Sequence, residues 1–350
     1  MLSKLRDAIA APATDAGATA QRHLDFLTKP PGSLGRLEEI AVRLAIIRTG
    51  TPRVEQPAIF VFAADHGVVA EGVSAYPQIV TAQMVENFLA GGAAINVLAR
   101  QAAARVVVAD FGVASPLPRS PGLVDCAVAR GSANMARGPA MTAAQAIATI
   151  ERGATLAEAA IDDGADLLVT GEMGIGNTTA ASAITAVVTG ADPAAVTGHG
   201  TGVDEDGWRR KVEVVRRALA VNRPDAGDGV DVLARVGGFE IGGLAGVILA
   251  GAAHRVPVVL DGFITAAAAL VATTLAPNAR HALFASHRSA EPGHAIALAH
   301  LVLEPYLDLR LRLGEGTGGA LFIHVARAAA AIYNEMATFK SAGVSGPVEP

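Results

Sequence analysis

The middle of the chain alternates short apolar runs with alanine-rich stretches of helical length, and this alternation limits the possible folds most strongly. The runs end in polar or glycine-rich clusters and lie at 58–64, 105–110, 166–171, 256–262 and 282–286, with a further candidate at 123–129. Continuous apolar strands that alternate with helices are typical of a parallel sheet buried on both faces. Because crossovers are right-handed, helices cover both sides. The sequence predicts an α/β fold, with a Rossmann-like, mainly parallel sheet in three α/β/α layers.

The two ends of the chain differ from the middle. Residues 1–50 predict helices around a turn at 29–33, with Ser33 as the N-cap of a helix that continues to Arg48, and residues 320–339 predict one helix. We expect an α/β/α domain at 51–310 that carries the chemistry, and a smaller helical domain from 1–50 plus 311–340. Residues 341–350 are expected to form a flexible tail.

Composition excludes several classes of protein. Of the 350 residues, 51% are hydrophobic and 4% aromatic, and the net charge is −5, which argues against nucleic-acid binding. The single cysteine, Cys126, excludes an internal disulfide framework and cysteine-rich metal sites. The apolar stretch at 242–276 is interrupted by His254, Arg255 and Asp261, so it predicts a buried helix, a strand and a second buried helix instead of a membrane span. We expect a cytoplasmic location.

The segment at 171–179, GEMGIGNTT, follows a predicted strand and opens a predicted helix at about 178–189. Backbone N–H groups at such a junction suit a phosphate, so Gly174, Gly176, Asn177 and Thr178 are candidate ligands. The segment is neither a Walker A loop nor a complete G-x-G-x-x-G fingerprint. A glycine-rich turn required only for tight packing is the alternative.

Two other glycine-rich segments carry candidate residues. The loop at 197–204 contains Gly202 and precedes a charged helix with Lys211, which suits either a phosphate or a solvated surface. In the segment at 312–319, Glu315 is flanked by glycines before the last helix. Its carboxylate suits a helix cap or an exposed general base.

Polar clusters follow three of the predicted strands, at 65–67, 261–263 and 286–291. They suit metal ligands, catalytic groups or hydrogen-bonded turns. No histidine pair has H-E-x-x-H or H-x-H spacing, and no G-x-S-x-G elbow occurs. We expect neither a metal nor a cofactor.

Nine segments in a fixed order carry a resemblance that extends from residue 29 to the final helix. They are KPPGSLGRLE (29–38), ADHGVVAEGVSAYPQIVT (64–81), ARGSANMARGPAM (129–141), GEMGIGNTT (171–179), KVEVVRRA (211–218), GVDVLARVGGFEIGGLAG (229–246), VVLDGF (258–263), SHRSAEPGH (286–294) and EPYLDLRLRLGEGTGGAL (304–321). Together they resemble the nicotinate-nucleotide–dimethylbenzimidazole phosphoribosyltransferase family. The residues alone led to the fold and a phosphate site, and the substrates come from the resemblance.

The resemblance implies a reaction and a set of roles. The phosphoribosyl group of nicotinate mononucleotide is transferred with inversion to 5,6-dimethylbenzimidazole, giving α-ribazole 5′-phosphate, for the lower nucleotide loop of cobalamin, and nicotinate. Glu315 would accept the proton of the attacking base, and Glu172 would orient the ribose or assist the base. The phosphate would be bound by a set of backbone and side-chain groups: Gly174, Gly176, Asn177, Thr178, Gly202, Lys211 and Ser289.

The resemblance also implies an apolar slot for the aromatic base, lined by the stretch 74–84. Tyr76, Gln83 and Met84 are its candidate residues, and Met84 is equally suited to helix packing. Tyr76 is bulkier than the side chain expected at this position. Dimethylbenzimidazole, a less substituted benzimidazole, a phenol and adenine therefore stay open as the base. The family resemblance further implies a homodimer.

Three other functions stay open. A transferase that uses phosphoribosyl pyrophosphate and Mg²⁺ needs an acidic pair after a strand, but Asp162 and Asp163 precede theirs. A dehydrogenase conflicts with the incomplete glycine fingerprint. A non-catalytic nucleotide- or base-binding protein would bind ligand without turnover, so replacement of Glu315 distinguishes it from an enzyme.

Overall fold

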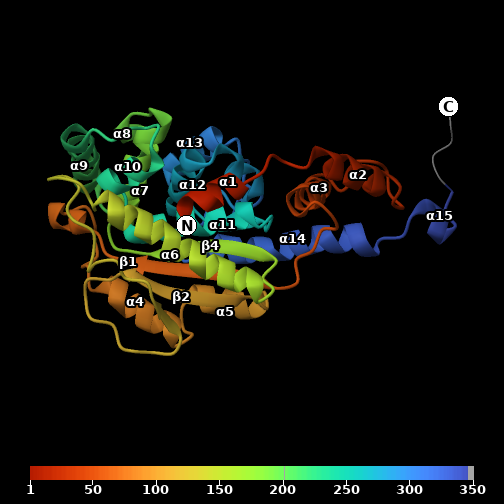
Figure 1. Ribbon diagram of the computed structural model, residues 1–350, viewed down its shortest axis with the longest axis horizontal. Coiled ribbons are helices and arrows are strands. Elements are labelled where there is room, and N and C mark those ends of the chain that lie inside the picture. The colour runs from red at the N-terminus through yellow and green to blue at the C-terminus, as the bar shows by residue number, and fades with distance from the viewer. Residues whose placement is uncertain (201, 346–350) are drawn as a thin grey trace.

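A parallel sheet forms the centre of the protein in the computed structural model, which describes residues 1–200 and 202–345 (Figure 1). The sheet has six strands in the order β3-β2-β1-β4-β5-β6, and every neighbouring pair is parallel. The strands are β1 (Pro57–Ala64), β2 (Arg105–Gly112), β3 (Leu123–Asp125), β4 (Leu167–Met173), β5 (Val258–Leu260) and β6 (Leu283–Ala285). The predicted parallel α/β fold is confirmed.

Strand β1 shows why the sheet is covered on both faces. All eight of its residues are buried. Ala58, Phe60 and Phe62 belong to one apolar core, and Ile59 and Val61 belong to the other. Because successive side chains of a strand point to opposite faces, a strand with no polar position needs a helical layer on each side.

Different helices cover the two faces. The first core lies under α6 (Ala143–Asp162), α11 (Phe239–Ala253) and α12 (Phe263–Leu275), and the second under α4 (Val80–Leu89), α5 (Ala94–Gln101) and α14 (Thr317–Glu335). Further elements are η1 (Gly67–Glu71), α7 (Asn177–Thr189), α8 (Pro193–Val196), α9 (Glu205–Asn222), α10 (Gly229–Val236), η2 (Pro277–Ala282) and α13 (Pro292–Leu301). The buried helix–strand–helix predicted at 242–276 corresponds to α11, β5 and α12. None of the described helices is long and apolar enough for a membrane span.

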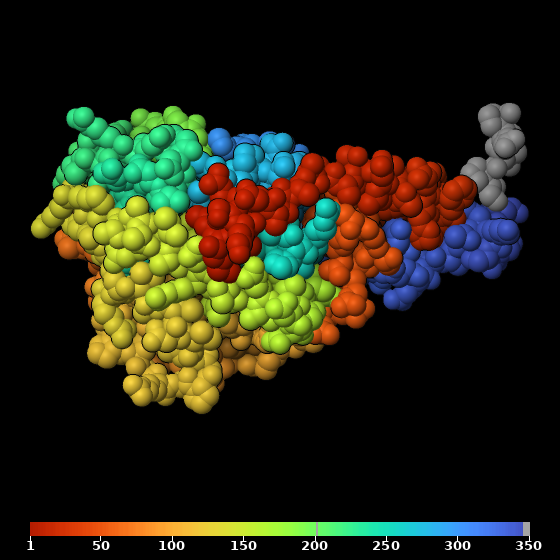
Figure 2. All heavy atoms as spheres, viewed as in Figure 1, coloured from red at the N-terminus to blue at the C-terminus, as the bar shows by residue number. Residues whose placement is uncertain are grey.

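Segments from both ends of the chain pack together in an arm beside the sheet, whereas the N-terminus itself lies on the main body (Figures 1 and 2). There α2 (Thr14–Asp25) packs on α3 (Arg36–Arg48), and α3 packs on α14. Helix α1 (Leu2–Ala8) instead lies against α6 and α11, with Leu5 in the first core. The division into 51–310 and 1–50 plus 311–340 stays a prediction.

Two local predictions about the ends were wrong. Helix α3 begins at Arg36, after Gly35 at φ 54°, and not after an N-cap at Ser33. The carboxylate of Glu38 accepts the Leu34 N–H and pairs with Lys29, so the turn continues to residue 35. The single helix predicted at 320–339 is two helices, because Met336 is extended and α15 (Phe339–Ala342) begins after Thr338. Of the predicted tail, residues 346–350 lie outside the described part.

The strand order places a topological switch between β1 and β4. The chain runs from β1 through β2 to β3 on one side and then returns to the other side of β1 as β4. Open parallel sheets bind ligands outside the carboxyl ends of the strands at such a switch. Residues 65–66 follow β1, and Glu172 lies near the end of β4.

Candidate functional site

A cleft of about 670 Å³ lies beyond the carboxyl ends of β4, β5 and β6. It is where the switch in strand order predicts a ligand. Five segments line it: the end of β4 with the start of α7, the loop before α9, the residues after β5, the residues after β6, and the loop before α14. The lining residues that bear on the chemistry are Glu172, Gly174, Asn177, Thr178, Gly200, His287, Ser289, Glu291, Arg312 and Gly314.

The glycine segment after β4 forms one wall of this cleft. Gly174 has no room for a side chain, because a Cβ there would overlap the Ala64 carbonyl oxygen. Gly176 has φ 94° and is the N-cap of α7, so this position favours glycine. The start of α7 lines the cleft, and the N-terminal end of a helix is where an anion is stabilised.

Glu172 is a buried carboxyl group in the same wall. Asn177 Nδ2 donates a hydrogen bond to Glu172 Oε2. Burial, together with the negative charges of Asp261, Glu240 and Glu315, raises the pKa of Glu172 to about 8 against the opposing effect of the Asn177 bond. Glu172 is therefore protonated near neutral pH and is a hydrogen-bond donor.

Lys211 is the buried cation of the site. Its side chain is 1% exposed, and its Nζ donates to Thr178 Oγ1 over 3.1 Å. Burial lowers the pKa of Lys211 to about 8, while the charge of Glu291 acts in the opposite direction. The solvated surface lysine that the sequence left open is excluded, since α9 directs Lys211 inward toward α7.

Glu315 lies in the loop that precedes α14. It has φ 64°, an uncommon conformation for a residue with a side chain. Its carboxylate Oε2 accepts the Ile95 N–H over 3.4 Å, and burial raises the pKa of the side chain. The neighbouring Gly314 lines the cleft, and a Cβ there would overlap Glu172 Oε1. The Glu315 loop and Glu172 thus meet at the carboxyl end of β4.

Asp261, after β5, fixes the Glu315 loop. Its carboxylate accepts backbone N–H groups from Gly316, Gly318 and Gly319 over 3.1, 2.7 and 3.2 Å. These are N-terminal N–H groups of α14, which have no acceptor within the helix. Burial raises the pKa of Asp261 to about 7, although the three hydrogen bonds act in the opposite direction.

A buried pair lies behind the glycine segment. His66 Nε2 and Glu240 Oε1 are 2.6 Å apart, and both side chains are at most 1% exposed. Burial disfavours the charged imidazole, but the charge and hydrogen bond of Glu240 outweigh it and raise the pKa of His66. A Cβ at Gly174 would lie within 3.4 Å of both side chains. The sequence analysis missed Glu240, whose signal is a single carboxylate in the apolar helix α11.

The candidate residues from the sequence fall into four groups. Glu315 stands by itself: it follows Gly314, but it is not among the residues that line the cleft, and its carboxylate is bonded to the Ile95 N–H. Glu172, Gly174, Asn177, Thr178 and Ser289 line the cleft, with Gly176 in the same segment and Lys211 bonded to Thr178. Gly202 lines an adjoining cavity of about 950 Å³ that shares Gly200, Glu291 and Arg312 with the cleft. The candidates for the base slot lie outside this lining: Tyr76 is 52% exposed, Gln83 is exposed, and Met84 is half-buried against the second core.

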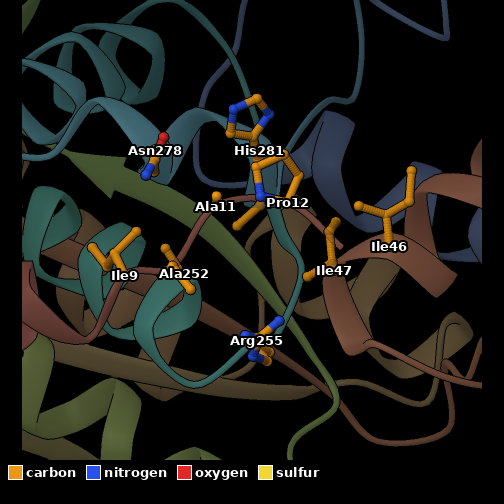
Figure 3. Close-up of a pocket in the computed structure, with 11 residues that line it drawn as sticks. Ile9, Ala11, Pro12, Ile46, Ile47, Ala252, Arg255, Asn278 and His281 are labelled. Carbon is orange, nitrogen blue, oxygen red and sulfur yellow. The ribbon is translucent and has the colours of Figure 1, made fainter. Parts of the chain in front are cut away.

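Another cavity, of about 350 Å³, lies at the opposite ends of the strands, on the side where β5 and β6 begin (Figure 3). Ile9, Pro12, Ile47, Arg255 and His281 line it, close to the points where β5 and β6 begin. It brings together none of the candidate residues. In the described ranges 1–200 and 202–345, no three His, Cys, Asp or Glu side chains are grouped to bind a metal ion.

Comparison with known proteins identifies the family of the chain. The model of a phosphoribosyltransferase family matches residues 9–344. Proteins named nicotinate-nucleotide–dimethylbenzimidazole phosphoribosyltransferase from Roseiflexus sp. strain RS-1 and Chloroflexus aggregans are each 57% identical, over 95% of this chain and 95% of their own. The crystal structure of CobT from Thermus thermophilus is 52% identical, with a TM-score of 0.91 over 95% of this chain and 99% of that one. The chain therefore belongs to the nicotinate-nucleotide–dimethylbenzimidazole phosphoribosyltransferase family.

Proposed function

We propose that the protein transfers the phosphoribosyl group of nicotinate mononucleotide to 5,6-dimethylbenzimidazole, releasing nicotinate. The product is α-ribazole 5′-phosphate, for the lower nucleotide loop of cobalamin. One observation carries this proposal: the glycine segment, Lys211 and the carboxyl group of Glu172 meet at the topological switch of a chain with 57% identity to named relatives. That combination provides an anion site beside proton-transfer groups.

The contacts support a phosphate end of the site at the glycine segment. Backbone N–H groups at Gly174 and Gly176 and the start of α7 would bind phosphate oxygens, together with Thr178 and Lys211. Gly202 and Ser289 would complete this end from the adjoining loops. Glu172, protonated near neutral pH and hydrogen-bonded to Asn177, would donate to the ribose and orient it.

The chemical step requires a base and a leaving group. A ring nitrogen of the benzimidazole attacks C1′ from the face opposite the pyridine, while the C1′–N bond breaks and its electron pair returns to the pyridinium nitrogen. The attacking ring loses the proton of its other nitrogen to the Glu315 carboxylate. The raised pKa of Glu315 makes it a stronger base than an exposed glutamate. Alignment of the two reactants contributes the rest of the acceleration.

The aromatic base is assigned to the start of α4. Thr81 Oγ1 accepts the Ile175 N–H over 3.1 Å, so this end of α4 adjoins the glycine segment. Tyr76, Gln83 and Met84 flank that contact in the sequence and would line the base slot. We further propose a cytoplasmic homodimer, which sedimentation of the purified protein and fractionation of cells would test.

The test is an assay of nicotinate mononucleotide with dimethylbenzimidazole, followed by chromatography with mass detection. We expect nicotinate and α-ribazole phosphate from the wild type and at least about 100-fold slower turnover from Glu315→Gln, since general-base help contributes 10²–10⁴-fold. Glu335→Gln is the matched control, because this exposed residue ends the helix that follows Glu315.

Each other outcome has a definite meaning. Equal rates for the wild type and Glu315→Gln would remove Glu315 from the role of base. The absence of product with dimethylbenzimidazole, benzimidazole, a phenol and adenine would contradict the transferase and favour a binding protein. Product from phosphoribosyl pyrophosphate and Mg²⁺ alone would indicate the other class of transferase.

A further inference from the structure

Glu291 is an acidic residue on a wall of the cleft that the proposed reaction leaves without a role. It is the N-cap residue of α13, but its side chain makes no capping bond to that helix. Instead, its Oε1 accepts the Gly200 N–H over 3.1 Å. The residue lines both the cleft and the adjoining cavity of about 950 Å³.

The second carboxylate oxygen of Glu291 is unusual. Oε2 is buried and has no hydrogen-bond partner among residues 1–200 and 202–345. A buried acceptor without a partner is unfavourable, and more so when it is charged. The glutamate is therefore not held there by the satisfaction of its own hydrogen bonds.

Glu291 and the cation of the site share one glycine loop. A Cβ at Gly198 would overlap Glu291 Oε2, and a Cβ at Gly200 would lie 2.8 Å from Lys211 Nζ. The carboxylate thus lies against one glycine of the loop and the ammonium against another. The charge of Glu291 also stabilises the protonated form of Lys211.

A backbone N–H group and a buried ammonium are the groups that a phosphate requires. Glu291 bonds to the first and balances the charge of the second. Two anions beside the same cation repel each other, and the repulsion is stronger where burial lowers the effective dielectric constant. A phosphate and the Glu291 carboxylate therefore compete for the same positive groups.

We propose that Glu291 is an internal counter-anion of the phosphate site: its carboxylate engages Gly200 N–H and balances Lys211 when the site is empty, and the phosphate of the substrate displaces it. The inference rests on the proposed function for the phosphate site. It assigns Glu291 the role of setting phosphate affinity, so that the product nucleotide is also released more readily.

The test compares phosphate binding by the wild type and Glu291→Gln. The amide oxygen of Gln can still accept the Gly200 N–H, whereas the negative charge is lost. We expect Glu291→Gln to bind inorganic phosphate at least about 5-fold more tightly in calorimetric titrations at pH 7 and low salt, with a similarly lower KM for nicotinate mononucleotide. Unchanged or weaker phosphate binding would overturn the proposal and make Glu291 a support of the loop.

Two further variants keep the result interpretable. Glu304→Gln changes the net charge equally at an exposed position just after α13, and it should leave phosphate affinity unchanged. Glu291→Ala removes both the charge and the hydrogen bond. Tighter binding by Glu291→Ala assigns the effect to charge even if the Gln variant folds poorly, and weaker binding by Glu291→Ala contradicts the proposal.

Failure of this inference is distinguishable from failure of the proposed function. If the wild type and Lys211→Met bind phosphate equally, the phosphate site itself is misplaced. If phosphate binding depends on Lys211 but is not tighter in Glu291→Gln, only the proposed role of Glu291 is contradicted.

Discussion

Lys211 is the buried positive charge of the proposed phosphate site. Burial of an ammonium is unfavourable, and neither its hydrogen bond to Thr178 nor the charge of Glu291 fully offsets it, since the pKa of Lys211 stays lowered to about 8. Such a residue is retained where it meets a charged ligand, and perturbed pKa values gather at functional sites for this reason. The His66–Glu240 pair differs, because each of its members already neutralises the other.

We expect Lys211→Met to raise the KM for nicotinate mononucleotide about 10- to 100-fold, since a hydrogen bond to a charged group contributes about 1.5–3 kcal/mol. The wild-type kcat/KM should fall as the pH rises above about 8, where Lys211 loses its proton. Initial-rate measurements from pH 6 to 9.5 test both statements. Lys4→Met, an exposed substitution in α1, is the control. Because Glu172 also has a pKa of about 8, Lys211→Met should keep a smaller fall above pH 8, and a fall as large as that of the wild type would contradict the assignment to Lys211.

Helix α14 shows how one element positions a catalytic candidate. Its first turn is bound to Asp261, which follows β5, so the Glu315 loop is anchored to the sheet. At its far end the same helix packs on α3 in the arm. Gly171 on β4 permits the approach, because a Cβ there would lie 2.6 Å from the Glu315 carbonyl oxygen. Helix α14 therefore connects the arm to the sheet and to the Glu315 loop.

We expect Asp261→Ala to lower the free energy of unfolding by about 1–3 kcal/mol, because it leaves buried N–H groups without an acceptor. It should also lower kcat, since the Glu315 loop loses its anchor. Chemical denaturation and steady-state kinetics measure the two effects. Asp228→Ala removes the N-cap of α10 and should cost stability without changing kcat. Full kcat in Asp261→Ala would show that the loop is held by other contacts.

The whole molecule carries several buried acids at one edge of the sheet. The switch between β1 and β4 brings the ends of separate chain segments together there. Glu172 and Asp261 have folded-state pKa values of about 8 and about 7, well above those of an unfolded chain. The folded protein therefore holds protons that the unfolded chain has released, and its stability depends on pH.

We expect the free energy of unfolding of the ligand-free protein to decrease as the pH rises from about 5 to 8, because the folded state binds more protons in that range. One pKa unit corresponds to about 1.4 kcal/mol, so the decrease should exceed about 1 kcal/mol. Denaturation of the wild type and Glu172→Gln at several pH values tests this. The Gln variant should have a smaller slope, whereas Glu335→Gln should keep the wild-type slope. Parallel curves for all three proteins would contradict the raised pKa of Glu172.

Local sequence patterns predicted the three layers of the fold. They also indicated the glycine-rich segments and the acidic residues of the candidate site. Uninterrupted apolar runs such as 58–64 require a sheet covered on both faces, and glycine-rich segments after strands indicate close backbone approach. These patterns are local in the sequence, and the structure has the covered sheet and the close backbone approaches that they predict. The order and number of the motifs also indicated the family, which the 57% identity of named relatives supports.

Local sequence patterns do not predict which of these segments lie in contact, because those contacts are set by the tertiary structure. The inward orientation of Lys211, the link from Asp261 to the Glu315 loop and the pairing of His66 with Glu240 join residues far apart in the chain. Strand order sets such contacts, and strand order depends on the packing of the whole sheet. The wrong N-cap at Ser33 has a more local cause, because Glu38 accepts the Leu34 N–H and pairs with Lys29, so the turn continues to Gly35. Local patterns therefore predicted whether a segment forms a strand or a helix, whereas long-range packing determines which elements lie beside it.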